Sequence, residues 1–185
     1  YYRIFISHLT ENKESATYLK NALVQYGIDC FVAHEDIEPS KLWQTEIEKA
    51  LASMDLLCAI LTPNFYQSQW CDQEVGIALG RSIPTLSIKK GADPHGFIGK
   101  YQAIKAKKTA DAVAKDVFDT ICKMENANQK YFSIFRVYPK KVYILAHIYI
   151  HTHPNIDWKG EKEHFTRTNK SISKIIFDSN IDDYE

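Results

Sequence analysis

Leu56-Leu57-Cys58-Ala59-Ile60-Leu61 is a run of sequence without a single polar side chain. A strand with one solvated face alternates apolar and polar residues, whereas a strand of a parallel sheet covered by helices on both faces is apolar throughout. Residues 56–61 therefore predict a central strand of a parallel α/β sheet.

Helical patterns separate this run from other short apolar runs, as expected when helices connect the strands of a parallel sheet. Thr10, Ser40 and Thr109 are placed to cap three of these helices, and Gly27 to end the first one. The predicted helices lie between residues 10 and 27, 40 and 54, 68 and 79, and 109 and 124. The predicted strands are residues 3–7, 29–33, 56–61, 83–88 and 102–105. This order predicts a flavodoxin-like, doubly wound, five-stranded parallel α/β sheet.

The pattern of the chain changes after the last of these helices. An aromatic segment at residues 131–138 precedes strand-like apolar runs at 142–150 and 172–177. We therefore predict two parts, an α/β domain over residues 1–125 and a small C-terminal extension over residues 126–185 that resembles a hairpin.

Charge and hydropathy argue against two classes of partner. The 23 basic residues balance the 23 acidic ones, so no net field attracts the chain to nucleic acid or to an anionic membrane. The longest apolar run, residues 142–150, is too short to span a bilayer, and no signal-peptide pattern lies near Tyr1. We expect a cytoplasmic protein with no nucleic-acid partner and no membrane partner.

Neither the cysteines nor the histidines predict a metal site. Neither paired spacing nor a Cys-x-x-Cys unit occurs among the four cysteines, Cys30, Cys58, Cys71 and Cys122. His147, His151 and His153 have no acidic or cysteine ligand among them, and alternation along a strand explains two of them. We expect no metal, no disulfide framework and reduced thiols.

Ligands of doubly wound sheets bind outside the carboxyl ends of the strands, where the strand order reverses. Here that point lies between the first and third strands, which draws attention to Ser7, His8, Thr62 and Asn64. Residues 7–12 lack the glycine of a flavin phosphate loop, and no aspartate ends the third strand as in phosphoacceptor receivers. Neither of these two functions is expected.

The stretch SQWCDQEVG at residues 68–76 holds the most distinctive candidates for chemistry. On a helix, Trp70 and Glu74 are four residues apart and share a face, so an indole and a carboxylate border the same cleft. Cys71, Val75 and Ala78 are predicted on the opposite, buried face.

A lone carboxylate suits one glycosidic bond in particular. An ordinary glycoside needs two carboxylates because the leaving alcohol must be protonated. Nicotinamide leaves NAD as a neutral molecule from a cationic bond, so one carboxylate is enough to stabilise the oxocarbenium-like ribose. An indole such as that of Trp70 can stack on a flat ring of the substrate.

Four segments carry a family resemblance: FISH at residues 5–8, HEDIEP at 34–39, the Ser-x-Trp-Cys-x-x-Glu string at 68–74, and residues 93–99. In this order and spacing they resemble a bacterial TIR (Toll/interleukin-1 receptor) domain. The resemblance implies a flavodoxin-like fold and self-association through the loop His34 to Lys41. In the enzymatic branch it implies cleavage of NAD to nicotinamide and ADP-ribose or a cyclic form. In bacteria such proteins commonly act as anti-phage effectors or signal to a partner.

The resemblance also implies a role for individual residues. Glu74 matches the catalytic glutamate, and Trp70, Ser7 and His8 match positions that line the nucleotide pocket. Further candidates for substrate binding are Asp36 and Trp43, in and just after the loop. NAD is then the substrate, no other cofactor is implied, and an effector or sensor protein is a candidate partner. The family loop often reads Pro-Gly where this chain has Pro39-Ser40, which leaves the loop's conformation and its part in assembly open.

Two alternatives remain open at this point. One is a TIR scaffold that joins partners through the same loop and does no chemistry. The other is an enzyme that resembles nucleoside deoxyribosyltransferases, which also break N-glycosidic bonds with a carboxylate. The pairing of Trp70 with Glu74 favours an NAD glycohydrolase or ADP-ribosyl cyclase over the scaffold, because an adaptor has no need of that pair.

Overall fold

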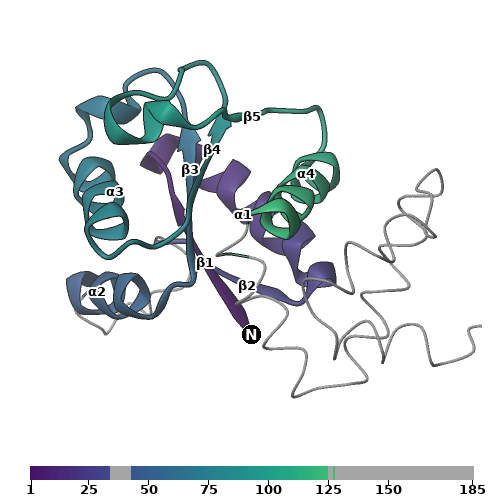
Figure 1. Cartoon of the computed structure of the whole chain (residues 1–185), viewed down its shortest axis with the longest axis horizontal. Coiled ribbons are helices and arrows are strands. Elements are labelled where there is room, and N and C mark those ends of the chain that lie inside the picture. The colour runs from purple at the N-terminus through teal and green to yellow at the C-terminus, as the bar shows by residue number, and fades with distance from the viewer. Residues whose placement is uncertain (34–42, 125–126, 128–185) are drawn as a thin grey trace, which may run out of the picture. The chain divides into compact units, whose positions relative to one another are not determined.

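The fold is a five-stranded parallel sheet with helices on both faces, seen in a computed structural model that describes residues 1–33, 43–124 and 127. The strand order is β2-β1-β3-β4-β5, so β3 lies at the centre (Figure 1). The strands are β1 Tyr2–Ser7, β2 Ile28–Phe31, β3 Leu56–Leu61, β4 Thr85–Lys89 and β5 Ile104–Lys105. The flavodoxin-like prediction is confirmed, including the bounds of the central strand.

Helices cover both faces of the sheet (Figure 1). On one face α2 and α3 pack on a core that includes the β3 side chains Leu57, Ala59 and Leu61, and α1 packs beside α4 on the other face. The helices are α1 Lys13–Leu23, α2 Trp43–Ser53, α3 Gln69–Gly80 and α4 Ala110–Lys123. Short 3-10 helices are η1 Thr10–Asn12, η2 Val24–Tyr26, η3 Phe65–Gln67 and η4 Gly96–Lys100.

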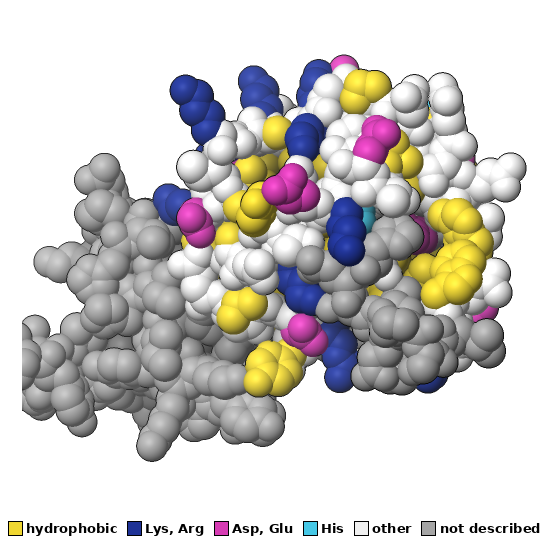
Figure 2. All heavy atoms as spheres, turned by 180° about the vertical axis from the view of Figure 1, so that it is seen from behind, with side chains coloured by type: hydrophobic (Ala, Val, Ile, Leu, Met, Phe, Trp, Pro, Cys, Tyr) yellow, Lys and Arg dark blue, Asp and Glu magenta, His cyan; other side chains and the backbone are white. Residues whose placement is uncertain are grey.

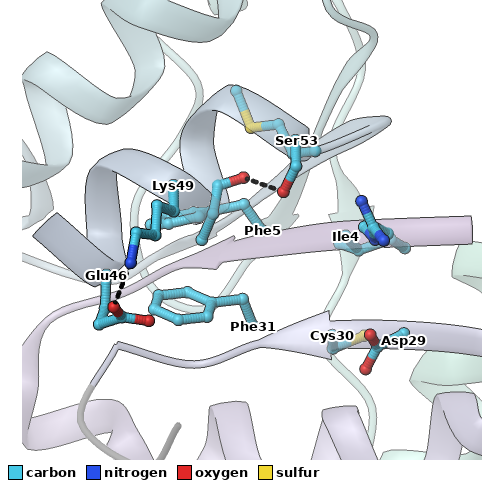
Figure 3. Close-up of a pocket in the computed structure, with 11 residues that line it drawn as sticks. Ile4, Phe5, Asp29, Cys30, Phe31, Glu46, Lys49 and Ser53 are labelled. Carbon is cyan, nitrogen blue, oxygen red and sulfur yellow. Dashed lines mark hydrogen bonds and ion pairs between the residues drawn. The ribbon is translucent and has the colours of Figure 1, made fainter. Parts of the chain in front are cut away.

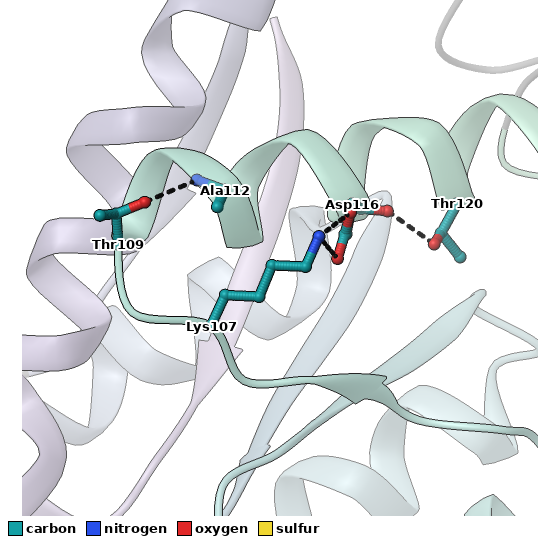
Figure 4. Close-up of polar contacts among 5 residues, drawn as sticks. All are labelled: Lys107, Thr109, Ala112, Asp116 and Thr120. Atoms are coloured by element: carbon teal, nitrogen blue, oxygen red, sulfur yellow. Dashed lines mark hydrogen bonds and ion pairs between the residues drawn. The ribbon is translucent and has the colours of Figure 1, made fainter.

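Side-chain caps fix the start of two helices. The Thr109 hydroxyl accepts a hydrogen bond from the Ala112 backbone N–H at 3.3 Å, as predicted for the start of α4 (Figure 4). One turn further on, Lys107 Nζ donates to Asp116 Oδ1 at 2.7 Å and ties the loop after β5 to the same helix. The Ser68 hydroxyl accepts from the Cys71 N–H at 3.3 Å and starts α3.

The start of α1 differs from the prediction. Thr10 does not directly precede α1, because residues 10–12 form the 3-10 helix η1 and α1 itself starts at Lys13. Asn12, just before α1, makes no side-chain capping bond, and its amide donates to the Thr62 hydroxyl at 3.3 Å. Gly27 does end this helical segment in the left-handed conformation, with φ at 68°.

Gly91 occupies a position where any side chain would be strained. Its φ is +109°, and a Cβ atom there would lie 2.9 Å from Cδ of Pro63. We expect Gly91→Ala to lower the free energy of unfolding by about 1–3 kcal/mol. Gly76, in the middle of α3 with open space around it, is the matched control, and Gly76→Ala should stabilise by about 0.5–1 kcal/mol. Urea unfolding of both variants checks the opposite signs, and a neutral Gly91→Ala would contradict this interpretation.

Several predictions concern residues outside the described part of the chain. They are the C-terminal extension 126–185 with its three histidines, of which the structure describes only Ala127, the loop 34–41 with Asp36, and the Ser40 cap. Among the described residues, no helix combines the length and the apolar character that a membrane crossing requires.

Candidate active site

The candidate site lies at the carboxyl end of β1, where Ser7 meets helix α3. Ser7 is the last residue of β1, and its hydroxyl donates a hydrogen bond to Oε2 of Glu74 at 2.5 Å. Both side chains are buried. The sheet order makes β1 and β3 neighbours, so this contact sits at the predicted point of strand-order reversal.

Burial changes the acidity of Glu74. Its side chain is only 6% exposed, and this desolvation raises its pKa from 4.5 to about 7, against the opposing effect of the Ser7 hydrogen bond. Among the described residues, Glu74 has no ion-pair partner. The carboxyl group is therefore close to half ionised at neutral pH.

The buried stripe of α3 includes the carboxylate. Cys71, Glu74 and Ala78 are the buried residues of the helix, so the prediction that Cys71 and Ala78 lie opposite Glu74 is wrong. Spacings of three and four residues place all three on one face. Burial raises the pKa of the Cys71 thiol, and the negative charge of Glu74 raises it further. A neutral thiol thus packs beside the carboxyl group.

Two indoles lie at the start of the helices on the same side of the sheet. Trp43 begins α2 and Trp70 lies in the first turn of α3, and their rings meet edge to face with centroids 4.8 Å apart. They are 46% and 44% exposed, which is high for residues of this size. Trp43 is not among the buried residues of α2, which are Ile47 and Leu51.

His8 does not join the pair formed by Ser7 and Glu74. Neighbouring residues of an extended chain point to opposite faces. The buried His8 ring accordingly turns back on its own strand, where Nδ1 donates to the Ile6 carbonyl at 2.9 Å. Of the predicted site residues, the structure brings together Ser7 with Glu74 and Trp43 with Trp70.

Further polar contacts at this end of the sheet involve Thr62, which the sequence indicated, and three residues that it did not indicate, Asn12, Ser15 and Lys90. Asn12 bonds to Thr62, and Nζ of Lys90 donates to the Ser15 hydroxyl at 2.5 Å, linking the end of β4 to α1. Lys90 follows a buried strand directly, which is the signal that could have drawn attention to it. Its neighbour Lys89 pairs with Asp93 instead.

Comparison with known families decides the classification. The sequence profile of the TIR domain matches residues 4–121, which is more than half of the chain and includes Ser7 and Glu74. The chain belongs to the TIR domain family. No curated protein sequence shows significant similarity to it.

Solved structures agree with this fold. The TIR domain of the Toll-related receptor TRR-2 from Hydra magnipapillata superposes with a TM-score of 0.50 at 20% identity, covering 63% of this chain and 91% of the receptor domain. The heterodimer of the RPS4 and RRS1 TIR domains gives 0.47 at 14% identity, covering 65% of this chain and 95% of the other. A 2-deoxyribosyltransferase from Bacillus psychrosaccharolyticus gives 0.45 at 14%, covering 62% and 89%. The last two likenesses are too loose to support an argument.

One groove of this TIR domain lies away from Glu74. It has a volume of about 350 Å³ and lies between α2 and the edge of the sheet formed by β1 and β2. Figure 3 shows the Phe5 and Phe31 rings in it beside the ion pair of Lys49 with Glu46. Its lining includes none of the predicted site residues.

The surface of the TIR domain carries no uniform charge on the face seen in Figure 2. Lysine and arginine side chains there are interspersed with aspartate and glutamate side chains. This distribution accords with the equal numbers of acidic and basic residues in the chain. No general electrostatic field would therefore draw a charged ligand to this face.

Proposed function

We propose that this TIR domain cleaves the bond between nicotinamide and ribose in NAD, with Glu74 as the catalytic residue. The observation that carries the proposal is the Glu74 carboxyl itself, buried at the ligand-binding edge of the sheet and held by Ser7. A buried carboxyl with a strongly raised pKa is uncommon outside functional sites, because burial of a charge costs stability.

Cleavage of this bond requires a negative charge near the ribose but no proton donor for the leaving group. When the C1′–N bond breaks, its electron pair moves to the pyridinium nitrogen, and nicotinamide departs neutral. The ribose is left as an oxocarbenium-like cation, which the Glu74 carboxylate stabilises. Water then attacks C1′ and loses a proton to give ADP-ribose, or a nitrogen of the adenine attacks to give a cyclic product.

Glu74 can supply that charge near neutral pH. Its pKa of about 7 leaves a large ionised fraction at pH 7 to 8. The positive charge of the bound nicotinamide ring favours the ionised form further, since a nearby cation lowers the pKa of a carboxyl group. The enzyme therefore becomes more active as the pH rises through neutrality.

The two indoles supply a surface for a flat ring. Trp70 lies one helical turn before Glu74 and is half exposed, and Trp43 supports it from α2. Stacking on an indole is favourable for nicotinamide or adenine. The family resemblance adds Ser7, Asp36 and His8 to the proposed pocket, although the His8 ring turns back on its own strand and would have to reorient to contact the substrate.

We also propose a biological setting for this activity. The protein acts in the cytoplasm as a bacterial defence or signalling enzyme, and it assembles through the loop His34 to Lys41. An effector or sensor protein either triggers it or responds to its product.

Chromatography of products tests the proposal. The full chain, assayed at low and at high concentration, should release nicotinamide from NAD and leave free nucleosides unchanged, and Glu74→Gln should abolish that release. Cleavage of nucleosides alone would indicate the deoxyribosyltransferase-like alternative. A folded wild type that is silent toward both, at every concentration, would refute the enzymatic proposal and favour the scaffold.

A further inference from the structure

Ser7 is fixed in place by the sheet. It ends β1, it is 0% exposed, and the backbone register sets it opposite Ala59 of the central strand. A side chain with a single torsion on such a backbone has little freedom to move. The position of its hydroxyl is therefore determined by the backbone of the sheet.

The hydroxyl engages only one oxygen of the carboxyl group. The Ser7 hydroxyl donates its proton to Oε2 of Glu74, with 2.5 Å between the two oxygens. Among the described residues, none donates a hydrogen bond to Oε1. Because the terminal torsion of a glutamate is broad, a carboxyl group without this bond would sample many orientations.

We infer that Ser7 is a positioning residue, which holds Oε2 so that Oε1 is the oxygen presented to the ribose of the substrate. The inference rests on the proposed function, and it gives Ser7 a different role from the substrate contact that the family resemblance implies. Ser7 acts through Glu74 and does not itself touch the reacting atoms.

The surroundings of Ser7 support this orientation. A serine hydroxyl has one proton to donate and lone pairs that accept. The one proton of the Ser7 hydroxyl goes to Glu74. Cys71, on the same buried face of α3, adds only a neutral thiol beside the carboxyl group.

Ser7→Ala tests the inference against a matched variant. Ser87 is a buried serine in β4 that lies on the other side of Ala59 in the same row of the sheet. Ser7→Ala should lower kcat for NAD about tenfold, the loss expected for one hydrogen bond to a charged group, with little change in KM. Ser87→Ala should leave both constants unchanged, and Ser7→Thr, which keeps the hydroxyl, should restore much of the rate.

The pKa of Glu74, measured by a pH titration, separates positioning from a simple loss of packing, because lost packing alone would not change it. The Ser7 hydrogen bond lowers the pKa of Glu74, so its removal should move the midpoint of the pH–rate curve upward, by on the order of one pH unit. Carboxyl 13C NMR of Glu74 follows the same change without requiring turnover.

The outcomes separate this inference from the proposed function. If wild type cleaves NAD and Glu74→Gln does not, while Ser7→Ala raises KM and leaves kcat and the NMR titration unchanged, Ser7 is a substrate contact and the positioning role is refuted. If wild type releases no nicotinamide at all, the proposed function fails first. A slower kcat together with an alkaline displacement of both titrations supports the inference.

Discussion

Glu74→Gln should make the folded TIR domain more stable than wild type at pH 8, by about 3 kcal/mol. Burial raises the pKa of this carboxyl from 4.5 to about 7, and a tenfold change in proton affinity corresponds to about 1.4 kcal/mol. The folded protein binds the proton more tightly than the unfolded chain. The stabilising contribution is therefore complete below about pH 4.5 and is lost as the pH rises through 7. Glutamine has no charge to bury, so the free energy of unfolding of the variant does not fall in this way as the pH rises.

Urea unfolding at pH 5 and pH 8 measures the effect. From pH 5 to pH 8, the free energy of unfolding of wild type should fall relative to that of Glu74→Gln. Asp72→Asn is the control, because Asp72 is an exposed acid on the same helix and its replacement should bring no such gain at pH 8. A constant difference between wild type and Glu74→Gln at both pH values would show that the carboxyl is not held in a desolvated site.

Glu74→Gln should at the same time lower the rate of nicotinamide release by a factor on the order of 100 to 1000. Glutamine keeps the size of the side chain and can still accept the Ser7 hydrogen bond, but it has no charge to stabilise the developing ribose cation. Loss of one preorganised electrostatic group at a reacting centre has effects of this size. Glu74→Asp keeps the charge but moves it back by one methylene, so an intermediate rate is expected.

The two predictions for Glu74→Gln reinforce each other. A variant that is more stable at pH 8 and yet inactive there cannot owe its inactivity to misfolding. Such a trade between stability and activity is typical of residues kept for function. If the variant were instead both less stable and inactive, the loss of activity would say nothing about catalysis.

The central strand and two of the helix starts could be predicted from local sequence. The run at residues 56–61 is apolar on both faces, and the Thr109 and Ser68 hydroxyls cap the turns that follow them. Local rules did not predict the start of the first helix, because residues 10–12 form a 3-10 helix before α1 begins at Lys13. They also did not indicate the contact of Asn12 with Thr62, which lies 50 residues further along the chain.

The candidate site could be predicted only in part for the same reason. The spacing of Trp70 and Glu74 indicated a carboxylate near an indole. Glutamate is usually solvated, so the sequence placed Cys71 and Glu74 on opposite faces of α3, whereas both are buried. The partner that accompanies this burial is Ser7, 67 residues earlier in the chain. Only the folded sheet brings the two together.

The pH dependence of nicotinamide release tests most directly whether an ionised Glu74 drives the reaction. With saturating NAD, the rate of the wild type should rise about tenfold per pH unit at low pH and level off at a midpoint near or below about 7, as ionisation of one carboxyl requires. Glu74→Gln should stay at a low rate throughout. A wild-type rate that is flat from about pH 5 to 8, or a Glu74→Gln variant that follows the wild-type curve, would contradict the account.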